Sequence, residues 1–409
     1  MGAGILGTVT AHADRAARWS AIALGFSIPI SIALDSVLSV AVLAGWLLSG
    51  DYRRKLDAIA RNPVAIGALL LFAMLLIGTL YGQRDPGDTS NYLGKYNDLL
   101  LIPVFAYCFR DEVDRRRAIF ALAAALVLTL ALSLLLKMGW LPQVSFIKGD
   151  AANASVFKHS ISHGILMSFG AFLFVNLSLR STSVEWRWIW LGLAILAAVN
   201  VLLMVQGRTG YVVLGILTLY AGFCWKGWRG VGATFAAVLL LSGALAVTPN
   251  AARDRVLLVI DEAQAWQPGK PNETSTGFRL SFYRNSLAIV AEHPLLGVGT
   301  GGFPKAYVDQ TRGTGLAPSR NPHNEYLLIA VQTGLIGLAL LLHLFWQHWR
   351  LAPRLATRLE THLSRGLLLT IAVGCLFNAL LLDHTEGLLF AWMTGLLCGE
   401  IRSRSDRPT

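Results

Sequence analysis

The sequence predicts an all-α protein that crosses a membrane many times. Of its 409 residues, 54% are hydrophobic and only 14% are charged, whereas a soluble domain carries about 25% charged residues. Several apolar runs approach or exceed the roughly 18 residues that suggest a spanning helix. The basic residues are also concentrated in every second connection between the apolar runs, on the side expected to be cytoplasmic, as the positive-inside rule requires. Together these observations indicate a polytopic helical membrane protein.

We expect about twelve transmembrane helices. The first two of the predicted spans are short and meet near Asp35, so they could form one bent element, and a turn at residues 206–210 separates the seventh from the eighth. The spans lie at about residues 19–34, 36–49, 63–81, 95–109, 117–136, 159–179, 187–205, 209–225, 230–248, 323–347, 365–382 and 386–401.

The distribution of basic residues gives the expected orientation. With the N-terminus inside, more than half of the 35 Lys and Arg residues fall in cytoplasmic segments, and these segments carry the whole net charge of +11. They include Arg402, Arg404 and Arg407 near the C-terminus, so both termini are expected in the cytoplasm. The basic balance therefore reports topology and contact with anionic membrane lipids. It does not indicate nucleic-acid binding, because no basic domain interleaved with aromatic residues is present.

One long polar segment divides the chain into three parts. Residues 1–248 hold the first nine spans, residues 249–322 form a loop domain, and residues 323–409 hold the last three spans and a tail. Apolar residues recur with helical spacing within the loop, at 253–266 and 277–293. A loop of this length is either functional or disordered. We expect a mostly helical cap on the outer, periplasmic face.

His323 is the leading catalytic candidate. Asn321 suits an N-cap and Pro322 suits the first helical position, so His323, Asn324 and Glu325 are expected in the first turn of a helix. The helix dipole there disfavours the imidazolium and should lower the pKa of the histidine. A neutral imidazole can accept a proton at neutral pH. Taken alone, this histidine is more readily explained as a hydrogen-bonded residue at the membrane interface.

Three arginines are candidates for holding an anion. Arg208 lies in the tight turn between the seventh and eighth spans, where it could also extend to lipid phosphates. Arg279 and Arg284 stand five residues apart on the second loop helix, so their side chains point about 140° apart and should serve different partners. Arginine remains ionised and matches phosphate with two parallel hydrogen bonds. With the histidine, these residues suit group transfer from a diphosphate-activated donor.

A glycine run offers a second possible contact for an anion. It follows His293 and includes Gly299, and its backbone N–H groups could approach a phosphate. The simpler interpretation is a helix end followed by a flexible turn.

We expect no metal and no cofactor. The sequence lacks a D-x-D motif, and the pair His159 and His163 lacks an evident third ligand. The turn at residues 383–386 could be a proton site, a metal site or a helix cap. Asp98 could pair with one of the arginines.

Two motifs resemble those of a known family. His323-Asn324, nine further residues and then Gly334-Leu-Ile-Gly337 fit the H-N-x9-G-x-x-G pattern of the O-antigen ligases and related O-oligosaccharyltransferases. The proline before the histidine, the segment His293-Pro-Leu-Leu-Gly-Val-Gly, the turn at 206–210 and the Arg279 segment are also similar to the domain shared by these ligases and the O-antigen polymerases. The resemblance extends to the layout of spans and loop.

The resemblance implies a GT-C-like, metal-independent glycosyltransferase of the bacterial inner membrane. Its donor would be undecaprenyl-diphosphate-linked O-antigen and its acceptor lipid A–core oligosaccharide, joined on the periplasmic side. By the same resemblance, His323 matches the essential histidine, Arg208 the first essential arginine and Arg279 the second, with Arg284 as its rival. Asn324 and Gly299 complete the expected substrate-binding set.

Two other functions remain open at this point. An O-antigen polymerase would use the same lipid-linked donor. A transporter of lipid-linked oligosaccharides would instead need a charged central cavity, whereas the charged candidates here gather at the outer face.

Overall fold

The computed structural model describes residues 2–82, 85–142, 144–248, 251–271 and 273–401. Within these ranges the chain is helical and has no strand, apart from one isolated bridge between Leu355 and Ile401. The all-α prediction is therefore confirmed. The basic residues Arg402, Arg404 and Arg407, which contributed to the orientation argument, lie outside the described residues.

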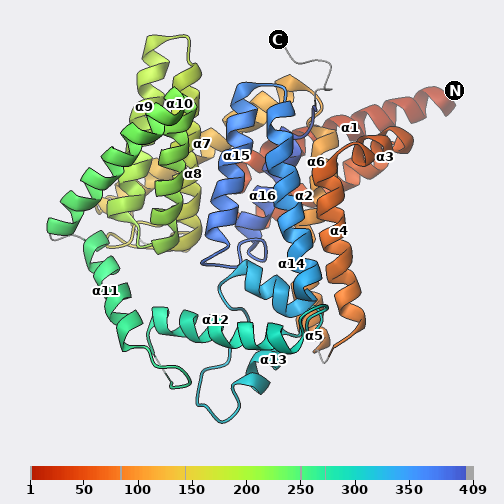
Figure 1. Ribbon diagram of the computed structural model, residues 1–409. Coiled ribbons are helices and arrows are strands. Elements are labelled where there is room, and N and C mark those ends of the chain that lie inside the picture. The colour runs from red at the N-terminus through yellow and green to blue at the C-terminus, as the bar shows by residue number, and fades with distance from the viewer. Residues whose placement is uncertain (1, 83–84, 143, 249–250, 272, 402–409) are drawn as a thin grey trace.

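The chain folds into a bundle of helices with a smaller helical layer at one end (Figure 1). The helices of the bundle are α1 (Gly2–Ser27), α2 (Ile32–Leu48), α3 (Tyr52–Ala60), α4 (Pro63–Ile77), η1 (Gly78–Leu80), α6 (Asp98–Cys108), α7 (Glu112–Lys137), α8 (Ser160–Arg180), α9 (Val184–Val199), η2 (Asn200–Met204), α10 (Arg208–Val247), α14 (Glu325–Leu351), η3 (Ala352–Arg354), α15 (Arg358–Gly374) and α16 (His384–Leu397). The layer at the end holds α5 (Pro86–Lys95), α11 (Ala251–Ala265), α12 (Ser275–Glu292) and α13 (Phe303–Gln310).

Six helical stretches among the described residues are long and apolar enough to cross a membrane. They are Pro63–Leu80, Glu112–Lys137, Ser160–Arg180, Val184–Met204, Arg208–Ala244 and Glu325–Arg354. A seventh appears if α2 and α3, which are bent by 114° at their junction, count as one broken span. Helices able to span a membrane are thus confirmed, but the predicted number of twelve is not.

Two features explain the difference in number. The predicted spans at 209–225 and 230–248 are two arms of α10, which kinks at Lys226 and Gly227. A Cβ on Gly230 would lie 1.9 Å from the carbonyl oxygen of Gly222, so the two arms approach very closely beside this kink. Four other predicted spans correspond to helices of fewer than 18 residues (α2, α6, α15 and α16), and the span predicted at 19–34 runs past the end of α1 at Ser27. For example, α16 has 14 residues, about 21 Å, against a hydrocarbon core of about 30 Å.

The short α16 is surrounded by other helices. Trp392 is fully buried and donates its indole N–H to the carbonyl oxygen of Ala21 at 2.7 Å. A Cβ on Gly395 would lie 2.4 Å from the Cβ of Phe105, so α16 and α6 pack with their backbones close together. Small residues permit such packing between membrane helices. Because its neighbours cover it, α16 need not match the bilayer thickness.

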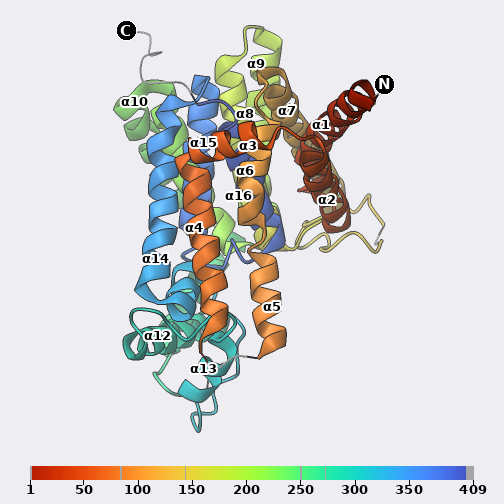
Figure 2. The same cartoon turned by 90° about the vertical axis from the view of Figure 1, so that its right-hand side faces the viewer.

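One end of the bundle is rich in arginine. Arg115 lies 2.8 Å from Glu360 and 2.6 Å from Glu400, and thereby joins the start of α7, the start of α15 and the segment after α16. Arg110, after α6, forms a 2.6 Å ion pair with Asp14 of α1. The helices α5, α12 and α13 lie together at the opposite end (Figure 2). The bundle therefore has an arginine-rich end and an end that is covered by the loop helices.

The loop contains helices where the sequence predicted them. The regions expected at 253–266 and 277–293 correspond to α11 and α12. The indole of Trp266 donates to the hydroxyl of Ser281 at 2.9 Å, and the Glu262 carboxylate accepts from the backbone N–H of Thr276 at 3.0 Å. These bonds connect α11 to α12, and α12 in turn packs on α14.

Candidate active site

His323 lies just before α14 and not within its first turn. The helix begins at Glu325, and the N-cap is Asn324, whose side chain accepts from the Leu327 N–H at 3.0 Å. His323 has a left-handed backbone, with φ of 54°. The side chain of Asn321 accepts from the His323 N–H at 2.6 Å. The predicted N-cap at Asn321 is therefore wrong by three residues. The side chain of Asn321 instead closes a local turn by bonding the backbone N–H two residues further on.

The backbone around His323 is anchored on two other parts of the chain. The Tyr283 hydroxyl on α12 donates to the carbonyl oxygens of His323 at 3.2 Å and of Leu376 at 2.9 Å. The side-chain amide of Asn324 donates to the same Leu376 oxygen at 3.0 Å. A left-handed backbone at a non-glycine residue persists only where its surroundings hold it. These contacts, from α12 and from the segment after α15, supply that support.

A buried carboxylate fixes the start of α14. Glu325 is fully buried, and it accepts hydrogen bonds from the Tyr96 hydroxyl at 2.5 Å and from the Leu381 N–H at 2.9 Å. Its own N–H donates to the carbonyl oxygen of Cys375 at 2.9 Å. The helix therefore cannot begin earlier without breaking this buried set of bonds.

The imidazole of His323 is half-buried and stacks on Phe282, with ring centroids 6.0 Å apart. Burial lowers the pKa of this imidazole, and the positive charge of Arg279 lowers it further, while a hydrogen bond with Asn378 acts in the opposite direction. The sequence also predicted a lowered pKa for His323, but it attributed the shift to the helix dipole. In the structure the causes are burial and the neighbouring Arg279. A neutral ring at neutral pH is what a proton acceptor needs.

The structure brings Arg208 and Arg279 together. Arg208 begins α10, where its guanidinium donates to the Thr276 hydroxyl at 3.1 Å and lies 3.7 Å from the Glu262 carboxylate. Arg279 is half-buried on α12, one turn after Thr276. Burial lowers the pKa of Arg279, and the nearby charge of Arg208 contributes in the same direction. Two guanidinium groups from distant parts of the sequence thus share one acidic neighbour.

Asn378 connects the arginine pair to the histidine. Its side-chain amide donates to the hydroxyl of Thr209, next to Arg208, at 2.8 Å, and its side chain also forms the hydrogen bond with His323. Sequence reasoning missed Asn378, Tyr283 and Glu262. A buried asparagine in the apolar stretch 365–382 was the one indication that the sequence offered, because polar residues in such segments are usually functional or paired.

Arg284 does not join this group. It is exposed on α12 and lies near Gly269 in the linker between α11 and α12. Its separation from Arg279 is the one expected from their spacing on a helix.

Gly299 lies in a segment whose N–H groups are used by the fold. The Gly299 N–H donates to the Gln332 carbonyl at 2.9 Å, the Val298 N–H to Val331 at 2.8 Å, and the Thr300 N–H to Gly78 at 2.9 Å. These donors are therefore occupied, which favours the structural interpretation of the glycine run over anion binding.

The motif glycines are explained by close packing of this segment on α14. Gly334 interrupts α14 with φ of 67°, and a Cβ there would lie 2.0 Å from the carbonyl oxygen of Leu295. The Leu335 N–H also donates to the Pro294 carbonyl at 2.8 Å. The two motifs that carry the family resemblance thus lie against each other in space.

A second cluster of ionisable residues lies inside the bundle. Asp35 is fully buried and accepts from the Ser27 hydroxyl at 2.5 Å. His384 lies 3.6 Å from Asp35, and Lys158 lies 3.9 Å from it. The turn at 383–386 thus contributes to an internal ion cluster. A Cβ on Gly387 would lie 3.3 Å from Asp98, which places Asp98 beside the same turn and not beside an arginine.

His159 and His163, the two histidines considered as zinc ligands, have different surroundings. His163 is buried and hydrogen-bonds Asn200 at 3.0 Å, and its neighbour His159 forms the N-cap of α8. Among the described residues, no group of three or more His, Cys, Asp or Glu side chains is arranged to hold a metal ion.

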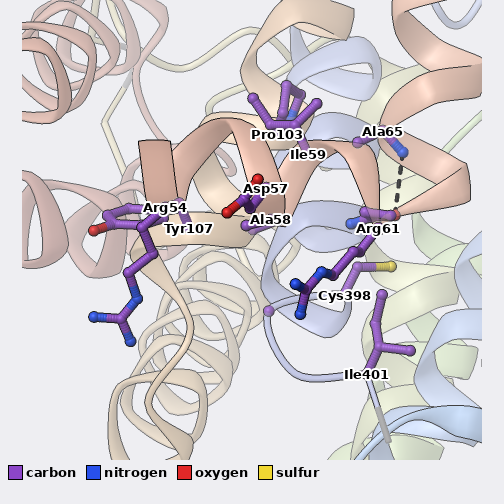
Figure 3. Close-up of a pocket in the computed structure, with 13 residues that line it drawn as sticks. Arg54, Asp57, Ala58, Ile59, Arg61, Ala65, Pro103, Tyr107, Cys398 and Ile401 are labelled. Carbon is purple, nitrogen blue, oxygen red and sulfur yellow. Dashed lines mark hydrogen bonds between the residues drawn. The ribbon is translucent and has the colours of Figure 1, made fainter. Parts of the chain in front are cut away.

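A cavity of about 390 Å³ lies at the arginine-rich end, between α3, α4, α6 and the segment after α16. Figure 3 shows Arg61 extending toward Cys398 in this cavity, with Arg54 at its other side. None of the predicted site residues lines it. The candidate site is therefore at the other end, where α12 meets α10 and α14.

The fold and the site define a class: an all-helical membrane protein with a histidine and two arginines at the end covered by its loop helices. Residues 193–342 match the family model described as "Wzy_C: O-Antigen ligase". This range includes Arg208, Arg279 and His323. The match confirms the resemblance to the O-antigen ligase/polymerase superfamily, whose members are glycosyltransferase-like enzymes.

One solved chain also aligns with the protein. It comes from work described as "Structural coordination of polymerization and crosslinking by a peptidoglycan synthase complex", with 17% identity and a TM-score of 0.47 over 81% of this chain and 94% of that chain. No curated protein matches the sequence.

Proposed function

We propose that the protein transfers O-antigen polysaccharide from undecaprenyl diphosphate to a hydroxyl of lipid A–core oligosaccharide, at the periplasmic face of the bacterial inner membrane. The observation that carries this proposal is the convergence of His323, Arg208 and Arg279 from three separate elements. Two arginines with one acidic neighbour, Glu262, leave positive charge that a diphosphate can match.

The reaction is a single displacement at the anomeric carbon of the donor. The acceptor hydroxyl oxygen forms the new C–O bond as the bond from the sugar to the diphosphate breaks, and the diphosphate leaves with the electron pair. His323 takes the proton of the hydroxyl, because its imidazole is neutral at neutral pH. Arg208 and Arg279 stabilise the negative charge that grows on the leaving diphosphate. No metal or cofactor takes part.

An apolar groove supports a lipid-linked donor. A hollow of about 450 Å³ lies between α8, α9 and α10 and is lined by Leu214 and Leu217, among others. Leu214 follows Arg208 by six residues on α10, a rise of about 9 Å. A polyprenyl chain in this groove would place its diphosphate toward the arginines.

Polymerisation is the second candidate, and the family match supports it equally, because the superfamily includes both ligases and polymerases. The same residues would then act on an acceptor hydroxyl that belongs to another lipid-linked chain. The two functions differ in their product and not in their chemistry.

A reconstituted reaction tests the proposal. The purified protein in liposomes receives lipid-linked O-antigen and lipid A–core oligosaccharide, and the products are separated by gel electrophoresis and weighed by mass spectrometry. We expect polysaccharide on lipid A–core. Longer polymer on the undecaprenyl carrier, with lipid A–core unchanged, would identify a polymerase. Absence of any glycan transfer by folded protein would contradict both.

A further inference from the structure

A large groove lies at the arginine-rich end, away from His323. It has a volume of about 1220 Å³ and runs between α7, α8, α9 and the start of α15. Its walls carry Phe120, Val127, Leu128, Trp186 and Trp190. Phe120, Leu128 and Trp186 are exposed in the described structure, although α7 and α9 belong to membrane-capable stretches. The proposed transfer reaction makes no use of this groove.

The groove has one polar end and one apolar end. Arg116, Arg180, Thr182 and Ser183 line the polar end, beside the turn between α8 and α9, whereas the lining along α7 is apolar as far as Ala131. Arg116 and Ala131 are fifteen residues apart on α7, a rise of about 22 Å. Half of the hydrocarbon core is roughly 15 Å thick. The apolar part of this lining, from Phe120 to Ala131, rises only about 16 Å, so a chain bound along it would span about one leaflet.

Positive charge at the polar end lacks acidic partners. Among the described residues, neither Arg116 nor Arg180 forms an ion pair with an acid. The Arg180 guanidinium lies 3.0 Å from a ring nitrogen of His362. The lining acid Glu360 is buried and already holds Arg115 at 2.8 Å.

Glu112, the second acid of the lining, belongs to the first turn of α7. There its charge offsets the positive end of the helix dipole. The polar end of the groove therefore carries a net positive charge next to a membrane surface.

We infer that this groove binds an anionic phospholipid, with the phosphodiester between Arg116 and Arg180 and one acyl chain along α7 and α9. Guanidinium groups match the phosphate oxygens with paired hydrogen bonds, and the hydroxyl of Thr182 can donate to a glycerol oxygen. The indoles of Trp186 and Trp190, whose centroids are 6.1 Å apart, suit the boundary between headgroups and chains. The site is separate from the proposed transfer site.

Native mass spectrometry of the full-length protein tests this inference. The protein in detergent is titrated with phosphatidylglycerol, with phosphatidylcholine or with glycerol phosphate, which lacks acyl chains. We expect retention of phosphatidylglycerol, weaker retention of phosphatidylcholine, and no bound glycerol phosphate. Equal retention of the two phospholipids would overturn the charge argument, and tight binding of glycerol phosphate would overturn the lipid assignment.

Variants locate the site. The double variant Arg116→Gln, Arg180→Gln should retain about tenfold less phosphatidylglycerol, since each basic residue near an anionic surface contributes to binding. The matched control is Arg350→Gln, because Arg350 is also exposed at this end but packs on Trp346 outside the groove. Unchanged retention in the double variant, or equal loss in the control, would contradict the proposal.

A second variant fills the apolar part without changing charge. Ala124 is exposed in the groove wall, so Ala124→Phe should fold and should reduce retention of both phospholipids. Normal retention would show that the chain does not lie along α7. Failure of the glycan-transfer assay would leave these binding results unaffected, so the two proposals can fail independently.

Discussion

His323 and His384 both lie next to charged residues, but the balance of charge around them differs. His323 is next to Arg279, and Arg208 completes an arginine pair that has Glu262 as its acidic neighbour. His384 faces the fully buried Asp35, which also holds Lys158 and Ser27. The first cluster has positive charge in excess and is half-buried. The second contains its own counter-charges inside the bundle.

This difference indicates what each cluster does. Positive charge left without an acid, at the end of the bundle, can be matched by an incoming anion. A buried acid with a lysine 3.9 Å away and a histidine 3.6 Å away instead has its counter-charges inside the protein, and removing one partner leaves an uncompensated charge. We therefore expect substitutions at the first cluster to affect transfer and substitutions at the second to affect stability.

Arg208→Lys tests whether the first cluster, around His323, acts in transfer. The substitution retains the charge but removes the fork that contacts two phosphate oxygens, so the rate of transfer should fall by about 10²–10³, as when one donor to a developing charge is lost. The measurement is the initial rate in the reconstituted assay. Arg284→Lys is the matched control, because Arg284 is exposed and apart from the group. Full activity of Arg208→Lys would reduce its role to that of a point charge.

Asp35→Ala tests whether the second cluster, around Asp35, contributes to stability. It leaves Lys158 and His384 without their buried partner, and such a loss costs about 3–5 kcal/mol. We expect a clearly lower thermal unfolding midpoint in detergent, while transfer per folded molecule stays near that of the unaltered protein. Asp57→Ala, at an exposed position of α3, serves as the control. A stable Asp35→Ala protein without transfer activity would contradict this assignment and would indicate that the internal cluster takes part in the reaction.

The pH dependence of transfer gives the smallest expected effect. Because the pKa of His323 is lowered, its ring stays neutral as the pH falls below the ordinary histidine value of about 6.5, so activity should persist there and disappear only at lower pH. Arg279→Gln removes one cause of the lowering, so the acidic limit of the rate should move to higher pH. An acidic limit that stays in place would show that Arg279 does not act on His323.

The sequence predicted the helical bundle and the helices of the loop, and it singled out His323, Arg208 and Arg279, which the structure brings close together. Hydropathy reports apolar length but not a kink at Gly227 or the covering of a 14-residue helix by its neighbours, so the twelve apolar runs do not each form one long helix. Asn321 and Asn324 are equally good caps by residue type. The choice between them depends on Tyr96 and Leu381, which hold Glu325 from distant parts of the chain.

The site residues that the sequence did not reveal have the same explanation. Asn378, Tyr283 and Glu262 are ordinary polar residues in their local sequence, and they become site residues only when the fold brings them to His323 or Arg208. Motif spacing identifies residues within one segment. Partners contributed by other segments depend on tertiary packing, which local patterns do not determine.

The most direct test of the central claim is a paired measurement of donor binding and transfer in His323→Ala. Removing a general base costs about 10²–10⁴ in rate, whereas the arginines that hold the diphosphate remain. We expect the variant to bind lipid-linked donor as tightly as the unaltered protein and to transfer almost none of it. His12→Ala, an exposed histidine on α1, provides the control. Near-normal transfer by folded His323→Ala would contradict the account.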